Sequence, residues 1–172
     1  IERKEKTMST TEQNLLDAFA GESQANRKYL AFAKKADDEG YPQVAKLFRA
    51  AAEAETVHAL THLKTLGAIG STAENLQTAI EGETHEFKKM YPEMIATADA
   101  DGDKPALRTF TYANEVEKVH AELYKKALDN IDSAGDVDCY YVCSVCGYTA
   151  ENEPPDRCPV CKAVAKAFNK VD

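Results

Sequence analysis

The 172-residue chain lacks several features that would point to common protein classes. It contains no tryptophan, and cysteine is absent from its first 138 residues. No run approaches the roughly 18 apolar residues of a membrane-spanning helix, and no apolar signal core lies near the N-terminus. Acidic residues outnumber basic ones by 29 to 21, for a formal net charge of −8, which argues against a surface for nucleic acid or anionic membranes. We therefore expect a cytoplasmic protein with no nucleic-acid or membrane partner.

Helical patterns occupy most of the chain, and the composition changes after residue 135. Capping boxes begin at Ser9 and Ser71, and glycines or prolines separate four helical stretches. Pro92 falls inside the third stretch and is expected to bend or break it near Tyr91. The remainder is rich in Tyr, Val, Cys and Pro. We predict a leader without assigned function at 1–9, a four-helix bundle at 10–135 and a small β-rich metal module at 136–172.

Six acidic and imidazole side chains recur with matched spacing in the helical stretches. Each of two Glu-x-x-His motifs follows a lone glutamate, by 33 residues in the first half of the bundle and by 34 in the second. Residues three apart lie on one helix face, so each motif can present a carboxylate and an imidazole to one metal ion. The halves therefore suggest a duplicated helix hairpin. The six residues are Glu22, Glu55, His58, Glu83, Glu117 and His120.

This pattern matches the ferritin-like di-iron bundles, in which two helices give one glutamate each and two give Glu-x-x-His. The alternative is that these side chains belong to solvated helix faces, as most glutamates do. Their matched positions in four helices, beside Ala, Val and Phe, favour metal ligation. Clustered carboxylates in an apolar interior would repel one another without cations, and added imidazoles suit iron or manganese better than calcium.

The five cysteines form a second candidate site near the C-terminus. Four of them make two Cys-x-x-Cys pairs separated by eleven residues, which is typical of a tetrathiolate metal site in a reducing compartment. This spacing alone leaves iron and zinc open. The predicted ligands are Cys143, Cys146, Cys158 and Cys161, and we interpret Cys139 as a free thiol.

Several motifs in combination resemble the rubrerythrin family. They are the segments Ile80–Thr84 and Met90–Glu93, Phe87, the opening Ala20–Ser23, both Glu-x-x-His motifs and the C-terminal cysteines. The resemblance covers nearly all of residues 10–172. It implies an all-α four-helix ferritin-like bundle followed by a β-rich rubredoxin-like domain. It also implies a seventh ligand, Glu86, which exchanges with His58 at one iron when the oxidation state changes, because ferric iron prefers an anionic oxygen.

Two tyrosines lie near the predicted ligands. Tyr29 follows Glu22 by seven residues, about 20° from the same helix face, and Tyr91 lies near the third-helix ligands. The resemblance implies that both hydroxyls orient glutamates and steady bound peroxide, whereas the alternative is that both are core tyrosines. We assign His62 and His85 to packing or hydrogen bonding rather than to direct ligation.

The cysteine module has its own resemblance. The run Tyr141-Val142-Cys143, the following Gly147-Tyr148, Pro155 and Cys158-Pro159 are similar to rubredoxin, which favours iron in the cell and allows zinc in overproduced protein. Gly147 is expected to adopt a positive φ. Lys162 stands where that family commonly has glycine, at a cost of roughly 1 kcal/mol if its backbone is left-handed.

The resemblance implies a non-haem peroxidase that reduces hydrogen peroxide to water and protects against oxidative stress. Electrons would pass singly through the iron tetrathiolate from a rubredoxin or a reductase linked to NAD(P)H. Two alternatives remain: ferritin-like iron storage with ferroxidase activity, and a dioxygen-reducing oxidase whose C-terminus is a zinc ribbon. The four-cysteine module argues against storage, which does not need it.

The connection between the second and third helices bears on assembly. Gly67–Thr72 spans only some 20 Å when extended, whereas the second helix is about 36 Å long. A ferritin-like bundle normally has a long crossover at this point. We therefore expect a domain-swapped homodimer in which each di-iron site takes ligands from both chains, with a simple up-down-up-down bundle as the alternative.

Overall fold

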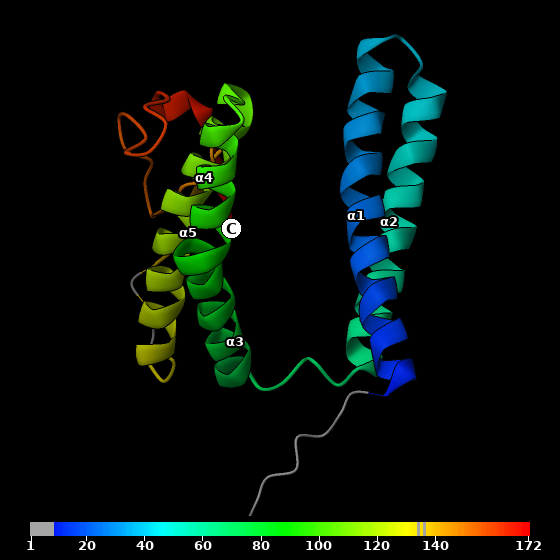
Figure 1. The fold of residues 1–172 in the computed structure, drawn as a ribbon, viewed down its shortest axis with the longest axis horizontal. Helices are drawn as coiled ribbons and strands as arrows, with labels where there is room; N and C mark the ends of the chain where they lie inside the picture. The colour runs from blue at the N-terminus through cyan, green and yellow to red at the C-terminus, as the bar shows by residue number, and fades with distance from the viewer. Residues whose placement is uncertain (1–8, 134, 136) are drawn as a thin grey trace, which may run out of the picture. The chain divides into compact units, whose positions relative to one another are not determined.

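The computed structural model describes residues 9–133, 135 and 137–172, and its contacts divide the chain into two compact units, Ile1–Gly70 and Ser71–Asp172. Figure 1 shows the helices of both units. The predicted leader lies outside the described residues except for Ser9. None of the helices in the described residues combines the length and apolar character needed to cross a bilayer.

The first unit is a hairpin of two long antiparallel helices, α1 (Thr10–Asp38) and α2 (Pro42–Thr65) (Figure 1). The predicted capping box is present: the Glu12 amide donates to the Ser9 hydroxyl, and the Ser9 amide donates to the Glu12 carboxylate. The turn passes through Gly40 at a φ of 79°. Only small side chains are fully buried, which lets the two helices approach closely; they are Ala33, Ala36, Ala45, Ala52 and Ala59.

The helical part of the second unit consists of α3 (Thr72–His85), the π-helix η1 (Glu86–Met90), α4 (Tyr91–Ala100) and α5 (Lys104–Asp129). The predicted capping box joins Ser71 and Glu74, and the Asp103 carboxylate caps α5 by accepting from the Ala106 amide. Each of the four predicted helical stretches is present. The third stretch contains α3, η1 and α4 in immediate succession.

The irregularity predicted near Pro92 takes the form of a π turn rather than a break. The Tyr91 amide donates to the Glu86 carbonyl, five residues back, and α4 begins at Tyr91. A proline in a regular α-helix lacks an amide donor and clashes with the carbonyl four residues back. The wider π turn just before Pro92 relieves this conflict, so the helical path continues.

The π turn also explains the unequal spacing of the two halves. Seven residues separate Glu22 from Tyr29, but eight separate Glu83 from Tyr91. From each tyrosine to the glutamate of the next Glu-x-x-His motif the separation is 26 residues in both halves. The single extra residue of the second half therefore falls in the segment that contains η1, and a π turn is how a helix accommodates one inserted residue.

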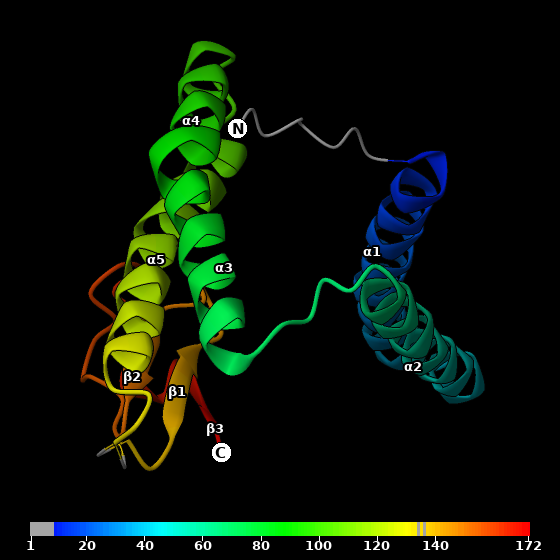
Figure 2. The ribbon, with the colours of Figure 1, turned by 90° about the horizontal axis from the view of Figure 1, so that it is seen from below.

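A small antiparallel sheet of order β2-β1-β3 follows, built from β1 (Tyr140–Cys143), β2 (Thr149–Glu151) and β3 (Phe168–Val171), with the short 3₁₀ helix η2 (Ala165–Ala167) before β3. Two cysteines and Phe168 form its core. The sheet lies beside α5 (Figure 2), where Lys126 pairs with Glu151 at 2.6 Å. These contacts place helices and sheet in one unit, and the domain boundary at residues 135 and 136 stays a prediction.

Candidate metal centres

The first cluster of possible metal ligands lies on the α1–α2 hairpin. One ligand atom each from Glu22, Glu55 and His58 lie within 4.8 Å of one another. The His58 Nδ1 is 2.8 Å from the Glu55 carboxylate, as expected for residues three apart on one helix. The imidazole is nevertheless 56% exposed. We call these three residues the first half-site.

Asn26 holds the two helices of the first half-site in register. It lies one turn after Glu22, and its amide donates to the Ala52 carbonyl at 2.7 Å and to the Thr56 hydroxyl at 2.9 Å. Both acceptors flank Glu55 on α2. This crosslink between helices therefore sets the carboxylates of Glu22 and Glu55 side by side.

The second cluster lies on α3 and α5. Ligand atoms of Glu83, Glu117 and His120 lie within 4.8 Å of one another. The His120 Nδ1 is 2.8 Å from Glu117 and 3.8 Å from Glu83. Burial and, next, the negative charge of Glu117 raise the pKa of Glu83 to about 7. We call these three residues the second half-site, and its crowded carboxylates are an environment that a bound cation would relieve.

Glu86 accompanies the second half-site without joining its tight group. It is the first residue of η1, and burial followed by the charge of Glu117 raises its pKa. The structure thus places its carboxylate in the field of Glu117. In the described part of the chain, the group within 4.8 Å consists of the other three residues. Its role as an exchangeable ligand stays a prediction.

The two predicted tyrosines differ in their surroundings. Burial and then the charges of Glu86, Glu117 and Glu83 raise the pKa of Tyr91, so its hydroxyl faces the acidic cluster. Tyr29 packs against two phenylalanine rings of its own hairpin at 6.1 and 6.3 Å, and its hydroxyl has no hydrogen bond to any described residue. The roles predicted for both hydroxyls stay predictions.

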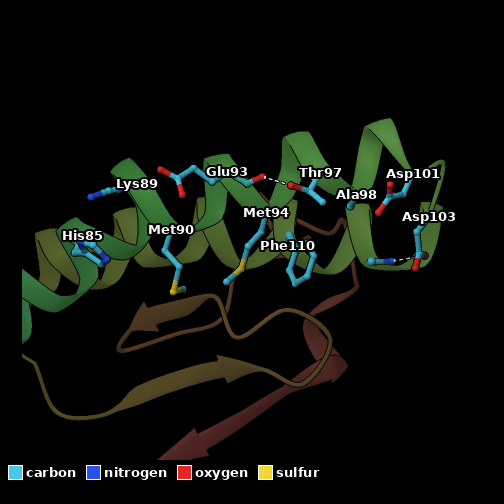
Figure 3. A pocket seen from close by; sticks show the side chains of 11 residues that line it. His85, Lys89, Met90, Glu93, Met94, Thr97, Ala98, Asp101, Asp103 and Phe110 are labelled. Atoms are coloured by element: carbon cyan, nitrogen blue, oxygen red, sulfur yellow. Dashed lines mark hydrogen bonds between the residues drawn. The ribbon is translucent and has the colours of Figure 1, made fainter.

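The two remaining histidines fall outside both half-sites. His62 lies in the last turn of α2. His85 lies at the end of α3, where it lines an open hollow of about 750 Å³. Figure 3 shows Met90, Met94 and Phe110 pointing toward the same side of this hollow. This face of the second unit is therefore largely apolar.

The four predicted cysteines converge in the C-terminal sheet. The sulfur atoms of Cys143 and Cys161 are 3.6 Å apart and those of Cys146 and Cys158 are 3.5 Å apart, with all four within 4.8 Å. A tetrahedral ion with bonds of about 2.3 Å needs sulfurs about 3.8 Å apart. The donor set therefore fits one tetrahedral iron or zinc ion.

Two backbone turns shape this site. In the first, the Gly147 amide donates to the Cys143 carbonyl at 2.8 Å, and in the second the Lys162 amide donates to the Cys158 carbonyl at 3.0 Å. Gly147 has a φ of 86° and Lys162 a φ of 65°, which confirms both predicted left-handed positions. The strain at Lys162, about 1 kcal/mol, is accepted where its ammonium donates to the Pro159 carbonyl.

Cys139 is separate from the tetrathiolate group in the described part of the chain. It is a buried free cysteine whose thiol donates to the Asn152 carbonyl at 3.6 Å.

One polar contact near the second half-site was not predicted from the sequence. The His120 Nε2 lies 3.0 Å from the hydroxyl of Thr149 on β2. The two residues are 29 positions apart and belong to a helix and a strand. Because no local motif marks Thr149, only the packing of the sheet on α5 reveals this neighbour.

Comparisons with known proteins match both parts of this arrangement. A family model described as "Rubrerythrin" matches residues 13–128, and one described as "Rubrerythrin, rubredoxin-like domain" matches residues 141–169.

Similar proteins match over most of their length. Rubrerythrin-2 of Clostridium acetobutylicum is 40% identical over 163 residues, covering 86% of this chain and 89% of the relative. Nigerythrin of Nitratidesulfovibrio vulgaris is 36% identical over 168 residues, covering 90% of this chain and 83% of the relative. A solved structure of nigerythrin in its fully reduced, all-ferrous state is 33% identical, with a TM-score of 0.58, and covers 99% of this chain and 91% of that chain. As the sequence motifs predicted, the chain belongs to the rubrerythrin family.

Proposed function

We propose that the protein is a non-haem di-iron peroxidase that reduces hydrogen peroxide to water. The proposal rests on one observation: two matching carboxylate and imidazole half-sites occur on the same chain as a four-cysteine site. Rubrerythrins are generally di-iron proteins of oxidative-stress protection and typically oxidoreductases. The specific reaction is the step that the proposal adds.

The residues would divide the work between the two kinds of site. The glutamates and histidines of both half-sites would hold two iron ions, with Glu86 and His58 as alternative ligands at one of them. When bound, the iron pair would supply the two electrons that, with two protons, convert hydrogen peroxide into two water molecules. The hydroxyl of Tyr91 faces the carboxylates and is placed to donate a hydrogen bond there.

The four cysteines would hold a third iron ion that accepts single electrons from a reductase or rubredoxin, with NAD(P)H as the source. Burial raises the pKa of the Cys146 thiol, so a metal ion must displace protons to bind. Free thiols at this density require a reducing environment, and a cytoplasmic location is part of the proposal. Storage of iron would not require this module beside α5.

We further propose that the functional form is a domain-swapped homodimer. Rubrerythrins are generally dimeric. Large apolar side chains on the α1–α2 hairpin are exposed, including Leu47 at 69%, Val57 at 57% and Leu60 at 55%. The second unit has its own apolar hollow beside Met90 and Phe110 (Figure 3). Two-helix units with open apolar faces need a partner, and a second copy of the chain would supply matching half-sites.

Anaerobic stopped-flow spectroscopy tests the peroxidase. The fully reduced, iron-loaded protein is mixed with hydrogen peroxide, and the visible band of the ferric tetrathiolate is followed. We expect the band to appear fast, with one peroxide consumed per two electrons. Slow reaction with peroxide but fast reaction with dioxygen would instead identify an oxidase, and uptake of many iron ions per chain would identify a storage protein.

A further inference from the structure

A short chain of hydrogen bonds connects the four-cysteine site to the second half-site. Thr149 follows the first cysteine pair by three residues, and its hydroxyl lies 3.2 Å from the Gly147 carbonyl and 3.0 Å from the His120 Nε2. Gly147 in turn directly follows Cys146. All of these residues belong to the second unit.

Packing holds the two ends of this chain together. Val116, one turn before His120 on α5, is 2% exposed, and a Cβ atom added at Gly147 would lie 3.8 Å from its Cγ1. The cysteine loop is therefore in contact with α5 at Gly147. This contact brings β2 close enough for Thr149 to reach the imidazole.

The hydrogen-bond chemistry fixes which way each proton points. A threonine hydroxyl has one proton to donate and can accept from other donors. The Gly147 carbonyl can only accept, so the Thr149 hydroxyl donates to it and accepts from the His120 ring. The Nε2 therefore carries a proton, and the Nδ1, which faces Glu117 at 2.8 Å, is the nitrogen whose lone pair can bind a metal ion.

We propose that Thr149 is a positioning residue for the second half-site: it fixes the tautomer and the ring orientation of His120 and makes this ligand depend on the cysteine loop. The proposal rests on metal binding in the proposed function, and not on the peroxidase reaction. Partners of the second ring nitrogen of a metal-binding histidine typically contribute 10- to 100-fold to metal affinity.

The test compares Thr149→Val, which keeps the shape and removes the hydroxyl, with Thr149→Ser, which keeps the hydroxyl. Thr111→Val is the matched control, because the Thr111 hydroxyl on the same helix donates only to the Leu107 carbonyl of its own helix. Ferrous ion affinity of the full-length protein is measured by competition with a coloured chelator. We expect Thr149→Val to weaken binding of one of the two ions 10- to 100-fold, and the other two variants to match the parent.

A spectroscopic readout separates positioning from general stability. In the zinc-loaded, ¹⁵N-labelled full-length protein, His120 should show a protonated Nε2 and a metal-bound Nδ1, and Thr149→Val should lose this signal pattern while Thr149→Ser retains it. Equal affinity in the parent and Thr149→Val, or equal losses in the Val and Ser variants, would overturn the proposal. If Thr149→Val does not fold, Thr149→Ala is compared with Thr149→Ser. Absence of iron binding to the glutamates and histidines in the parent would refute the proposed function itself.

Discussion

The two half-sites present the same ligand types in different surroundings. His58 of the first is 56% exposed, whereas His120 of the second is 26% exposed and has hydrogen-bonding neighbours at both ring nitrogens. The first half-site lies on two uninterrupted α-helices. The second has a π turn that carries Glu86 and leads into Tyr91. The duplicated hairpin thus gives both halves the same ligand spacing, and one inserted residue makes the second half different.

This difference suggests a division of roles. A weakly enclosed imidazole such as His58 can leave a metal ion at low cost, because water can replace its contacts. The second half-site holds its ligand His120 from two sides and adds the acidic Glu86 nearby. An iron pair bound by both halves would therefore have one adaptable side and one fixed side, which agrees with the proposed exchange between His58 and Glu86.

The largest effect is expected from breaking one half-site in each of two chains. We predict that Glu55→Ala and Glu117→Ala each reduce peroxidase activity about 1,000-fold, or about 4 kcal/mol. In a swapped heterodimer of the two variants, one site combines both changes and the other regains every ligand. Refolding an equal mixture should restore about a quarter of the parent activity, because about half the dimers are mixed and each has one intact site of two.

The control for this experiment is the mixture of each variant with itself, refolded in the same way. If the mixed sample remains as inactive as these controls, each site is built within one chain. The unswapped bundle would then replace the domain-swapped dimer.

The next effect concerns the π turn and Pro92. We predict that deleting Lys89, which removes the extra residue of the second half, forces Pro92 into a regular α-helix and destabilises the protein by about 3 kcal/mol. Adding Pro92→Ala should recover most of this loss, because alanine restores the amide donor. Urea unfolding of the four proteins in this cycle checks the prediction, and an equal loss with and without Pro92 would show that the two features are independent.

Local motifs of the sequence were sufficient to predict much of this architecture. Ser9 with Glu12 and Ser71 with Glu74 mark helix starts through contacts three residues apart, and the paired cysteines mark their turns in the same way. The π turn was not predicted, because a single inserted residue is visible only when the two halves are compared against tertiary positions. The neighbour Thr149 was also missed, since its partner lies 29 residues away in another element.

A smaller effect is expected from removing the acid that distinguishes the second half. We predict that Glu86→Gln leaves ferrous iron binding close to the parent but slows reoxidation by hydrogen peroxide 10- to 100-fold, or about 1.4 to 2.7 kcal/mol. The physical reason is that ferric iron gains most from an anionic oxygen. Glu81→Gln is the matched control, because this exposed glutamate on α3 accepts from Gln77. Stopped-flow rates measure the effect, and equal rates for both variants would remove Glu86 from the cycle.

The smallest effect concerns the metal-free protein and its dependence on pH. The pKa of Glu83 is raised from 4.5 to about 7 in the folded state, so between these values the folded protein binds more protons than the unfolded one. The free energy of unfolding should therefore fall as the pH rises from about 4.5 to about 7, by roughly 1 to 2 kcal/mol once solvent screening of this partly exposed carboxyl is allowed for. Glu83→Gln should abolish this decline, whereas Glu22→Gln, at the matching position of the first half-site, should retain it. Urea unfolding of the metal-free variants at pH 5 and pH 7.5 measures the difference, and equal slopes for both would mean that the crowding of carboxylates is not peculiar to the second half-site.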